Sequence, residues 1–158
     1  MPGGISVGRL DLADEVVARS VLALQRDSYA VEAGLIGDDR IPALTETLDE
    51  LRHAALEWLG AFDEAGLAGA VSWTELDDGT VDIDRLFVAP RAFRRGIATA
   101  LLDGIDALYP DRRILVSTGR ANVPAVTLYL GRGFRRVRER EVIPGLWITE
   151  LDRPAPEG

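Results

Sequence analysis

The segment Phe87-Val88-Ala89-Pro90-Arg91-Ala92-Phe93-Arg94-Arg95-Gly96-Ile97-Ala98-Thr99 leads from a strand into a helix. Apolar residues alternate with more polar ones ahead of it, and Pro90 ends the strand because proline cannot donate to a sheet ladder. After Gly96, apolar residues recur at helical spacing as far as Leu108. The segment therefore predicts a strand, a tight turn and a helix, and the rest of the chain is interpreted around it.

The predicted turn has the properties of an anion-binding site. The first backbone N–H groups of a helix have no acceptor within the helix, and the helix dipole adds positive potential there. Gly96 and the small Ala98 let a phosphate approach the main chain closely, and Arg91, Arg94 and Arg95 add charge. The turn is a candidate pyrophosphate cradle. A surface connection with solvated arginines is an equally good interpretation of the loop alone.

Two common phosphate-binding motifs are excluded at this turn. The Gly-Lys-Ser/Thr end of a Walker loop is missing. A dinucleotide-binding glycine fingerprint opens a parallel βαβ unit, whereas the strands ahead of this turn alternate with short turns. Acidic residues and glycine mark those turns. We therefore expect a three-stranded antiparallel meander, with strands over residues 56–62, 67–76 and 80–88.

The N-terminal part of the chain is predicted to hold one strand and one clear helix. Ile5–Leu10 is the strand, and Asp11 is the expected N-cap of the helix that follows it. Residues 27–42 are interpreted as irregular or broken helix. Thr47 and Glu50 have the spacing of a capping box, which predicts a further short helix.

The C-terminal part continues the alternation of strands and helices. Arg113–Ser117 predicts a short buried strand, and a second helix follows it. Strands over Arg135–Val142 and Leu146–Leu151 close the chain, with outward charges that are typical of a sheet edge. The element order βα(α)βββαβαββ predicts one α/β (α+β) domain over residues 1–153 and a flexible tail over residues 154–158.

Charge is divided unevenly along the 158 residues, whose net charge is −8. Residues 1–84 hold 18 acidic residues and 5 arginines, whereas residues 85–140 hold 12 arginines and 4 acidic residues. A local basic field can serve an anionic ligand inside an acidic protein. The division therefore indicates an anionic ligand near the predicted turn and a cationic, amine-bearing partner near the acidic half.

Composition excludes several classes of protein. The chain has no cysteine and one histidine, which excludes disulfides, thiolate zinc sites, cysteine nucleophiles and multi-histidine metal sites. No apolar run approaches the ~18 residues of a membrane span, and the start lacks a signal-peptide pattern. No aromatic and basic pattern of nucleic-acid recognition accompanies the arginines. We expect a cytoplasmic protein with no metal and with no nucleic-acid or membrane partner.

A second group of residues lies downstream of the turn. Asn122, the only asparagine in the chain, stands where a strand end meets a helix start. Tyr129 follows seven residues later, so both side chains can point toward the same strand end. Taken singly, Asn122 is interpreted as a helix N-cap and Tyr129 as a packed aromatic.

Taken together, these patterns resemble the GNAT superfamily of acyl-CoA-dependent N-acetyltransferases. The motifs cover Val81–Phe134, and the element order extends the resemblance over nearly the whole chain. The resemblance implies the GNAT fold, a mixed and mostly antiparallel sheet of about six to seven strands flanked by helices. It rests on Arg94-Arg95-Gly96-Ile97-Ala98 after a strand and on the later run of Asn122, Ala125, Leu128, Tyr129, Gly133 and Phe134.

The resemblance implies acetyl-CoA as the co-substrate. Phe93 departs from the Gln or Arg that the family motif has at this position, which removes one polar side chain. Asn122 matches an asparagine that binds the pantetheine arm, and the strand Leu86-Phe87-Val88 matches the edge that pairs with this arm. The implied pyrophosphate-binding amides are those of Arg94, Arg95, Gly96, Ile97, Ala98 and Thr99.

The resemblance also implies roles in catalysis. Tyr129 matches a tyrosine near the thioester sulfur, the acid for the departing thiolate. A base must take a proton from the amine, and Asp82 aligns with a glutamate that the family often uses. Asp84 shares the face of Asp82 if no bulge intervenes; Glu75 and Glu32 are further candidates. A polar outer strand face is an equally good interpretation of the two aspartates.

The expected function is transfer of an acetyl group from acetyl-CoA to a primary amine, on a small molecule or a peptide, by direct attack. A non-catalytic acyl-CoA-binding or sensing module is the alternative; it would keep Gly96 and Asn122 and need no Tyr129. The strands over Arg135–Leu151 offer edges for a homodimer.

Overall fold

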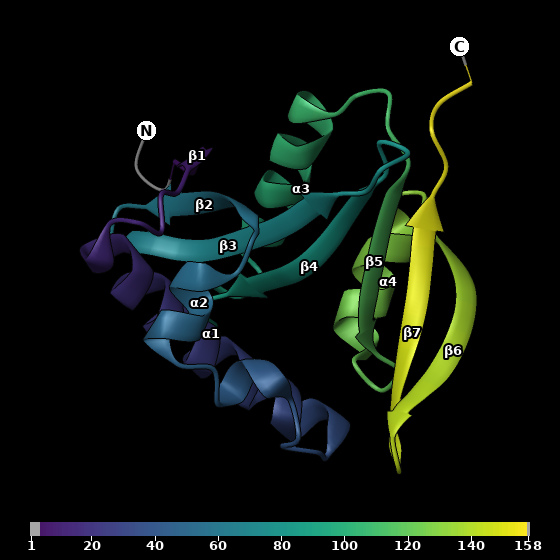
Figure 1. Cartoon of the computed structure of the whole chain (residues 1–158), viewed down its shortest axis with the longest axis horizontal. Coiled ribbons are helices and arrows are strands. Elements are labelled where there is room, and N and C mark those ends of the chain that lie inside the picture. The colour runs from purple at the N-terminus through teal and green to yellow at the C-terminus, as the bar shows by residue number, and fades with distance from the viewer. Residues whose placement is uncertain (1–3, 158) are drawn as a thin grey trace.

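A seven-stranded sheet forms the centre of the molecule (Figure 1). The computed structural model describes residues 4–157. Only β4 and β5 are parallel neighbours; every other neighbouring pair is antiparallel. The predicted mixed sheet and its antiparallel meander are confirmed. The strands, in their order across the sheet, are β1 (Ser6–Arg9), β2 (Glu57–Asp63), β3 (Gly66–Glu75), β4 (Val81–Val88), β5 (Ile114–Gly119), β7 (Leu146–Arg153) and β6 (Arg135–Ile143).

Helices cover both faces of this sheet (Figure 1). One face carries α1 and α2, and the other carries α3 and α4. Gly69 of β3 allows the close approach of α3, because a Cβ there would lie 2.6 Å from Cγ2 of Ile97. No helix within residues 4–157 is long and apolar enough to cross a membrane. The helices are α1 (Glu15–Ile36), α2 (Leu48–His53), α3 (Ile97–Leu108) and α4 (Val123–Gly131), with short 3₁₀ turns η1 (Pro42–Leu44) and η2 (Pro90–Ala92).

Helix α1 differs from its prediction at both ends. Its N-cap is Asp14 rather than Asp11, with the Asp14 carboxylate accepting from the backbone N–H of Val16 at 2.9 Å. The helix continues unbroken to Ile36, with Gly37 as its C-cap, through residues for which the sequence predicts irregular structure or a broken helix. Tyr29 explains the difference, since its ring packs on Phe87 of the sheet at 5.8 Å between centroids. Tertiary packing thus outweighs the weak helix propensity of this stretch.

The predicted capping box of α2 is confirmed. The Glu50 backbone N–H donates to Oγ1 of Thr47 at 3.1 Å, and the Thr47 N–H donates to Oε1 of Glu50 at 3.0 Å. These two bonds satisfy N–H groups that have no partner within the helix. They fix where the chain returns to the sheet after η1.

The parallel pair at the middle of the sheet is short. Strands β4 and β5 pair only over Val81–Ile83 and Ile114–Val116. A bulge follows in β4, because Ser72 lies opposite Arg85 while the next residue of β3 lies opposite Ile83. Beyond the bulge, β4 and β5 diverge (Figure 1). The sheet therefore opens at the bulge, and a cavity lies in that opening.

Candidate active site

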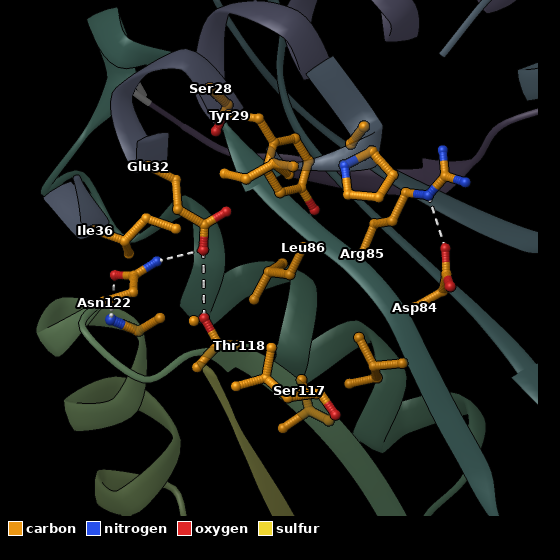
Figure 2. A pocket seen from close by; sticks show the side chains of 18 of the residues that line it. Ser28, Tyr29, Glu32, Ile36, Asp84, Arg85, Leu86, Ser117, Thr118 and Asn122 are labelled. Atoms are coloured by element: carbon orange, nitrogen blue, oxygen red, sulfur yellow. Dashed lines mark hydrogen bonds and ion pairs between the residues drawn. The ribbon is translucent and has the colours of Figure 1, made fainter. Parts of the chain in front are cut away.

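A cavity of about 580 Å³ occupies the opening between β4 and β5 (Figure 2). The end of α1 and the chain through η1 form one wall, and the start of α4 forms another. Apolar side chains from the β6–β7 hairpin, including Leu146 and Ile148, close a third side. Two of the predicted catalytic residues, Asp84 and Tyr129, lie in this cavity, together with the predicted pantetheine contacts Leu86 and Asn122.

Tyr129 reaches the cavity from α4 while remaining 4% exposed. Its ring packs against Phe134 at 5.5 Å between centroids, which fixes its direction. Burial raises the pKa of Tyr129 above the usual range of a phenol, and the charge of Glu32 raises it further. A phenol with the usual pKa of about 10 is already protonated at neutral pH, and burial favours this form further.

The Asn122 side chain forms two hydrogen bonds in the structure. Its Oδ1 accepts from the backbone N–H of Ala125 at 3.3 Å, so the N-cap interpretation is confirmed. Its Nδ2 donates to Oε1 of Glu32 on α1 at 2.8 Å. The side chain thus positions the start of α4 and joins it to the opposite wall of the cavity.

The start of α3 matches the predicted strand–turn–helix. Gly96 is the N-cap residue with φ of +82°, and Arg94 also has a positive φ, of +63°. No side chain within the described residues caps this end, so the first amides of α3 have no acceptor in the helix. Arg91 and Arg95 both bind Asp63, the last residue of β2, at 2.8 and 3.3 Å. Their charge therefore lies beside the helix end but is partly neutralised.

The strand Leu86–Val88 has one edge free of sheet pairing beyond the bulge. Leu86 lines the cavity, whereas Phe87 is buried against Tyr29 and Trp58. The Val88 N–H donates to Oγ of Ser28 at 3.3 Å. Of these three residues, Leu86 is the one that lines the cavity, and the Val88 N–H is already bound by Ser28.

Comparisons with known proteins agree with this geometry. Residues 19–134 match the acetyltransferase (GNAT) family. The chain belongs to this family. It is 34% identical over 137 residues to "UPF0157 protein YqkA" of Bacillus subtilis, covering 86% of this chain and 40% of YqkA. It is 31% identical over 101 residues to "Peptidyl-lysine N-acetyltransferase YiaC" of Escherichia coli, covering 58% of this chain and 64% of YiaC. The chain therefore spans less than two thirds of either relative.

Solved structures share the GNAT fold with this chain. The ribosomal-protein-S18-alanine N-acetyltransferase of Escherichia coli has a TM-score of 0.74 at 13% identity, covering 98% of this chain and 96% of its own. The PaiA N-acetyltransferase of Thermoplasma acidophilum, in complex with coenzyme A, has a TM-score of 0.72 at 15% identity, covering 96% and 99%. At such identities the similarity concerns the fold.

The two aspartates expected on the GNAT strand before the turn are separated by the bulge. Asp84 lines the cavity, and Nε of Arg85 donates to its Oδ2 at 2.7 Å. Asp82 is half-buried and is not among the residues that line the cavity. Burial raises the pKa of Asp82, and the charges of Asp84 and Glu150 raise it further. The condition for a shared face, an unbulged strand, is therefore not met.

The two other carboxylates considered from the sequence lie far apart. Glu75, at the end of β3, accepts from Nη1 of Arg112 at 3.3 Å and from the Tyr109 hydroxyl at 3.4 Å, outside the cavity. Glu32 lines the cavity on α1, where it meets Asn122 and Oγ1 of Thr118. Only the continuity of α1, which the sequence did not predict, places Glu32 there.

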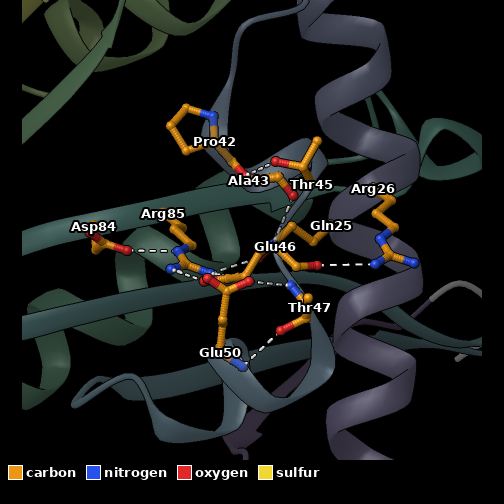
Figure 3. A network of polar contacts seen from close by, with 10 residues as sticks. All are labelled: Gln25, Arg26, Pro42, Ala43, Thr45, Glu46, Thr47, Glu50, Asp84 and Arg85. Atoms are coloured by element: carbon orange, nitrogen blue, oxygen red, sulfur yellow. Dashed lines mark hydrogen bonds and ion pairs between the residues drawn. The ribbon is translucent and has the colours of Figure 1, made fainter.

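A partly buried polar network, which the sequence did not predict, borders the same cavity (Figure 3). The Arg85 guanidinium binds the Glu46 carboxylate through both Nη atoms, with Nη2 at 2.9 Å. Gln25, which is fully buried, donates to Glu46 at 2.9 Å and accepts from Arg85 at 3.0 Å. Two features of the sequence could have indicated this network. Arg85 lies inside a predicted strand, and Gln25 lies beside the apolar stripe of the first predicted helix. The network holds the chain around η1 against β4.

Proposed function

We propose that this chain is an acetyl-CoA-dependent N-acetyltransferase that moves the acetyl group to a primary amine by direct attack. The observation that supports this proposal is one cavity, opened where β4 and β5 of the GNAT fold diverge, that is lined by the buried Tyr129 and by carboxylates. The peptidyl-lysine acetyltransferase YiaC is a relative, which supports an amine acceptor. The acceptor class is a small-molecule or peptide amine.

The donor half of the site fits the pyrophosphate and pantetheine of acetyl-CoA. The positive φ angles of Arg94 and Gly96 turn the main chain into α3, whose first amides have no side-chain cap. We assign the pyrophosphate to the amides from Arg94 to Thr99, and the pantetheine arm to Asn122 and the free edge of Leu86–Val88. The departure at Phe93 leaves these amides in place; its side chain is 42% exposed.

The proposed reaction needs an acid and a base in the cavity. Bound acetyl-CoA supplies an acetyl thioester. Tyr129 donates its proton to the sulfur as the new C–N bond forms and the C–S bond breaks. A carboxylate takes the proton that the amine nitrogen loses, so one proton is given and one is received. Asp82 and Asp84 stay predictions for this second role, with Asp84 the one that lines the cavity.

The charge of the cavity favours a cationic acceptor. Four carboxylates line it against a single arginine, Arg85. A cavity that carries net negative charge concentrates cations, so it attracts an ammonium group before the reaction. The apolar residues of the β6–β7 hairpin leave room for an uncharged part of the same molecule. The lining carboxylates are those of Glu32, Glu46, Glu50 and Asp84.

Thiol release in the presence of acetyl-CoA tests the proposal. The amine panel is spermidine, phenethylamine, a peptide with a free N-terminal alanine, and an N-acetylated peptide with one lysine. We expect calorimetric binding of acetyl-CoA, and thiol release with at least one amine that gains one acetyl group by mass spectrometry. Binding without turnover across the panel would instead support the sensing module.

A further inference from the structure

The proton acceptor of the proposed reaction must face the cavity and have a free oxygen. Asp82 and Glu75 do not line the cavity. Their positions follow from the sheet, since Asp82 precedes the bulge and Glu75 lies at the far end of β3. Neither carboxylate meets the first requirement, which leaves the four carboxylates of the cavity wall.

Three of these four carboxylates have at least one oxygen in a stabilising contact, although Oδ1 of Asp84 and Oε2 of Glu50 have no hydrogen-bond partner within residues 4–157. Asp84 binds Nε of Arg85 at 2.7 Å, and both oxygens of Glu46 bind the Nη atoms of the same guanidinium. Glu50 accepts from the Thr47 N–H in the capping box of α2. A carboxylate paired with a guanidinium must weaken an ion pair in order to take a proton, which disfavours it as a base.

Glu32 differs from Asp84 and Glu46 because no guanidinium binds it, and from Glu50 because it is partly buried and closes no capping box. Its Oε1 accepts from Asn122 at 2.8 Å and from Thr118 at 3.5 Å, and both donors are neutral. Its Oε2 has no hydrogen-bond partner within residues 4–157, and Glu32 forms no ion pair with them. Figure 2 shows this second oxygen pointing away from Asn122 and Thr118, toward the side of the cavity where Tyr29 and Leu86 lie. The carboxylate is therefore held in place with one oxygen open to the cavity.

Glu32 also shares the cavity with the proposed acid. The titratable groups that face it are Tyr29 on its own helix and Tyr129 on α4, and Arg85 and Asp84 face the same space from β4. Burial raises the pKa of both tyrosines, and the Glu32 charge raises each further. A carboxylate beside a phenol that stays protonated is an arrangement suited to an acid–base pair.

We propose that Glu32 is the catalytic base: its Oε2 takes the proton from the acceptor amine. This inference rests on the proposed acetyltransferase function and deepens it. The amine nitrogen forms a bond to the acetyl carbon, the carbon–sulfur bond breaks, and the sulfur receives the Tyr129 proton. Glu32 holds the proton from the nitrogen, and exchange with solvent restores both residues after the products leave.

The variant Glu32→Gln tests this role with little change in shape. Its amide oxygen can still accept from Asn122 and Thr118, while its charge and basicity are lost. The acceptors are the lysine peptide and the alanine peptide, whose amines have pKa values of about 10.4 and 7.7–8.0. With the lysine peptide at pH 7, we expect kcat to fall about 100-fold with acetyl-CoA affinity unchanged.

The pH profile separates a base from a merely structural residue. Without a base, the rate follows the uncharged fraction of the amine, which rises about tenfold per pH unit below the amine pKa. The Glu32→Gln defect should therefore shrink as pH rises, and it should be smaller for the alanine peptide than for the lysine peptide. Glu32→Asp retains a carboxylate and should keep the wild-type shape of the profile at a lower kcat.

Two further variants complete the experiment. Glu15→Gln, on the exposed first turn of the same helix, should retain wild-type kcat. Asp84→Asn tests the competing candidate for the base. A loss of kcat in this variant that recovers at high pH would overturn the assignment of Glu32. Wild-type kcat in Glu32→Gln would also overturn it while leaving the proposed function intact. If the wild-type protein releases no thiol with any amine of the panel, the proposed function fails, and the assignment of Glu32 fails with it.

Discussion

The N-termini of α3 and α4 are built in opposite ways. Helix α3 begins at Gly96, which has no side chain to offer, and no side chain among residues 4–157 caps its first amides. Helix α4 begins at Asn122, whose Oδ1 accepts from the Ala125 N–H. Both helices start at the end of the sheet where β4 and β5 diverge (Figure 1). An uncapped helix end is available to an anion, whereas a capped end stabilises the helix itself.

We expect the α3 end to serve in ligand binding and the α4 end to position side chains. The α3 end is suited to hold the phosphates of a ligand through the main chain. The α4 end is suited to hold Tyr129 and, through Nδ2 of Asn122, to fix Glu32. Variants at the first end should change cofactor affinity, and variants at the second should change turnover or stability.

The largest effect is expected from Gly96→Glu. The substitution adds a negative charge at the start of α3 and forces a side chain into a backbone with φ of +82°. Losing two charge-assisted hydrogen bonds of about 2 kcal/mol each weakens binding about 1,000-fold. Isothermal titration calorimetry with acetyl-CoA measures the change.

Gly37→Glu is the matched control for that variant. Gly37 also has a positive φ, of +70°, and a Cβ there would meet no atom within 4 Å, as at Gly96. It therefore carries the same backbone strain at a distance from α3, and acetyl-CoA affinity should be retained. Equal affinity of Gly96→Glu and the wild-type protein would refute the phosphate assignment.

Tyr129→Phe should give the next largest effect, a fall in kcat of about 100-fold. The ring packing against Phe134 is preserved, so acetyl-CoA affinity should not change. Because burial raises the pKa of Tyr129, wild-type activity should persist at pH values where an ordinary phenol ionises, about 10. Initial rates of thiol release across pH check both statements.

Tyr109→Phe provides the comparison for Tyr129→Phe. The Tyr109 hydroxyl accepts from Nε1 of Trp73 at 3.0 Å, outside the cavity. Its loss should change stability but not kcat. Unchanged turnover in Tyr129→Phe would mean that another group protonates the sulfur.

A smaller effect is expected from Asn122→Ala. Loss of the cap should lower the free energy of unfolding by about 1 kcal/mol and the Tm by about 2–4 °C. Asn122→Ser keeps a capping oxygen and should recover most of this loss, yet it lacks the Nδ2 donor to Glu32. Thermal unfolding and kcat measured together separate the two roles. Equal stability of the alanine and serine variants would argue against the capping bond.

The smallest effect concerns the arginines beside α3. Arg95 forms ion pairs with Asp63 and Glu64, whereas Arg94 forms no ion pair within the described residues. Arg94→Ala should therefore weaken acetyl-CoA binding about threefold, with Arg95→Ala changing it less. Calorimetry at two salt concentrations should show a reduced salt dependence for Arg94→Ala. A larger loss for Arg95→Ala would reverse this ranking.

Local patterns were sufficient for many elements of the fold. The capping box of Thr47 and Glu50, the antiparallel meander and the strand–turn–helix around Gly96 each depend on neighbouring residues, and each is confirmed. The N-cap position of Asn122 is of the same kind. Helix α1 is the exception, because packing of Tyr29 against Phe87 is a long-range contact that its local sequence does not contain.

The two motifs and the element order, by themselves, indicated the family, and the uneven charge predicted an anionic ligand near the turn before α3. Only the tertiary structure decided which carboxylates share the cavity with Tyr129. The bulge at Asp84 breaks the strand periodicity, and Arg85 engages Asp84 and Glu46. The unbroken α1 brings Glu32 across some ninety residues of sequence to Asn122. The periodicity of a sequence indicates which face of its own helix or strand a residue occupies. Whether a carboxylate forms an ion pair depends on residues from other elements, which periodicity does not contain.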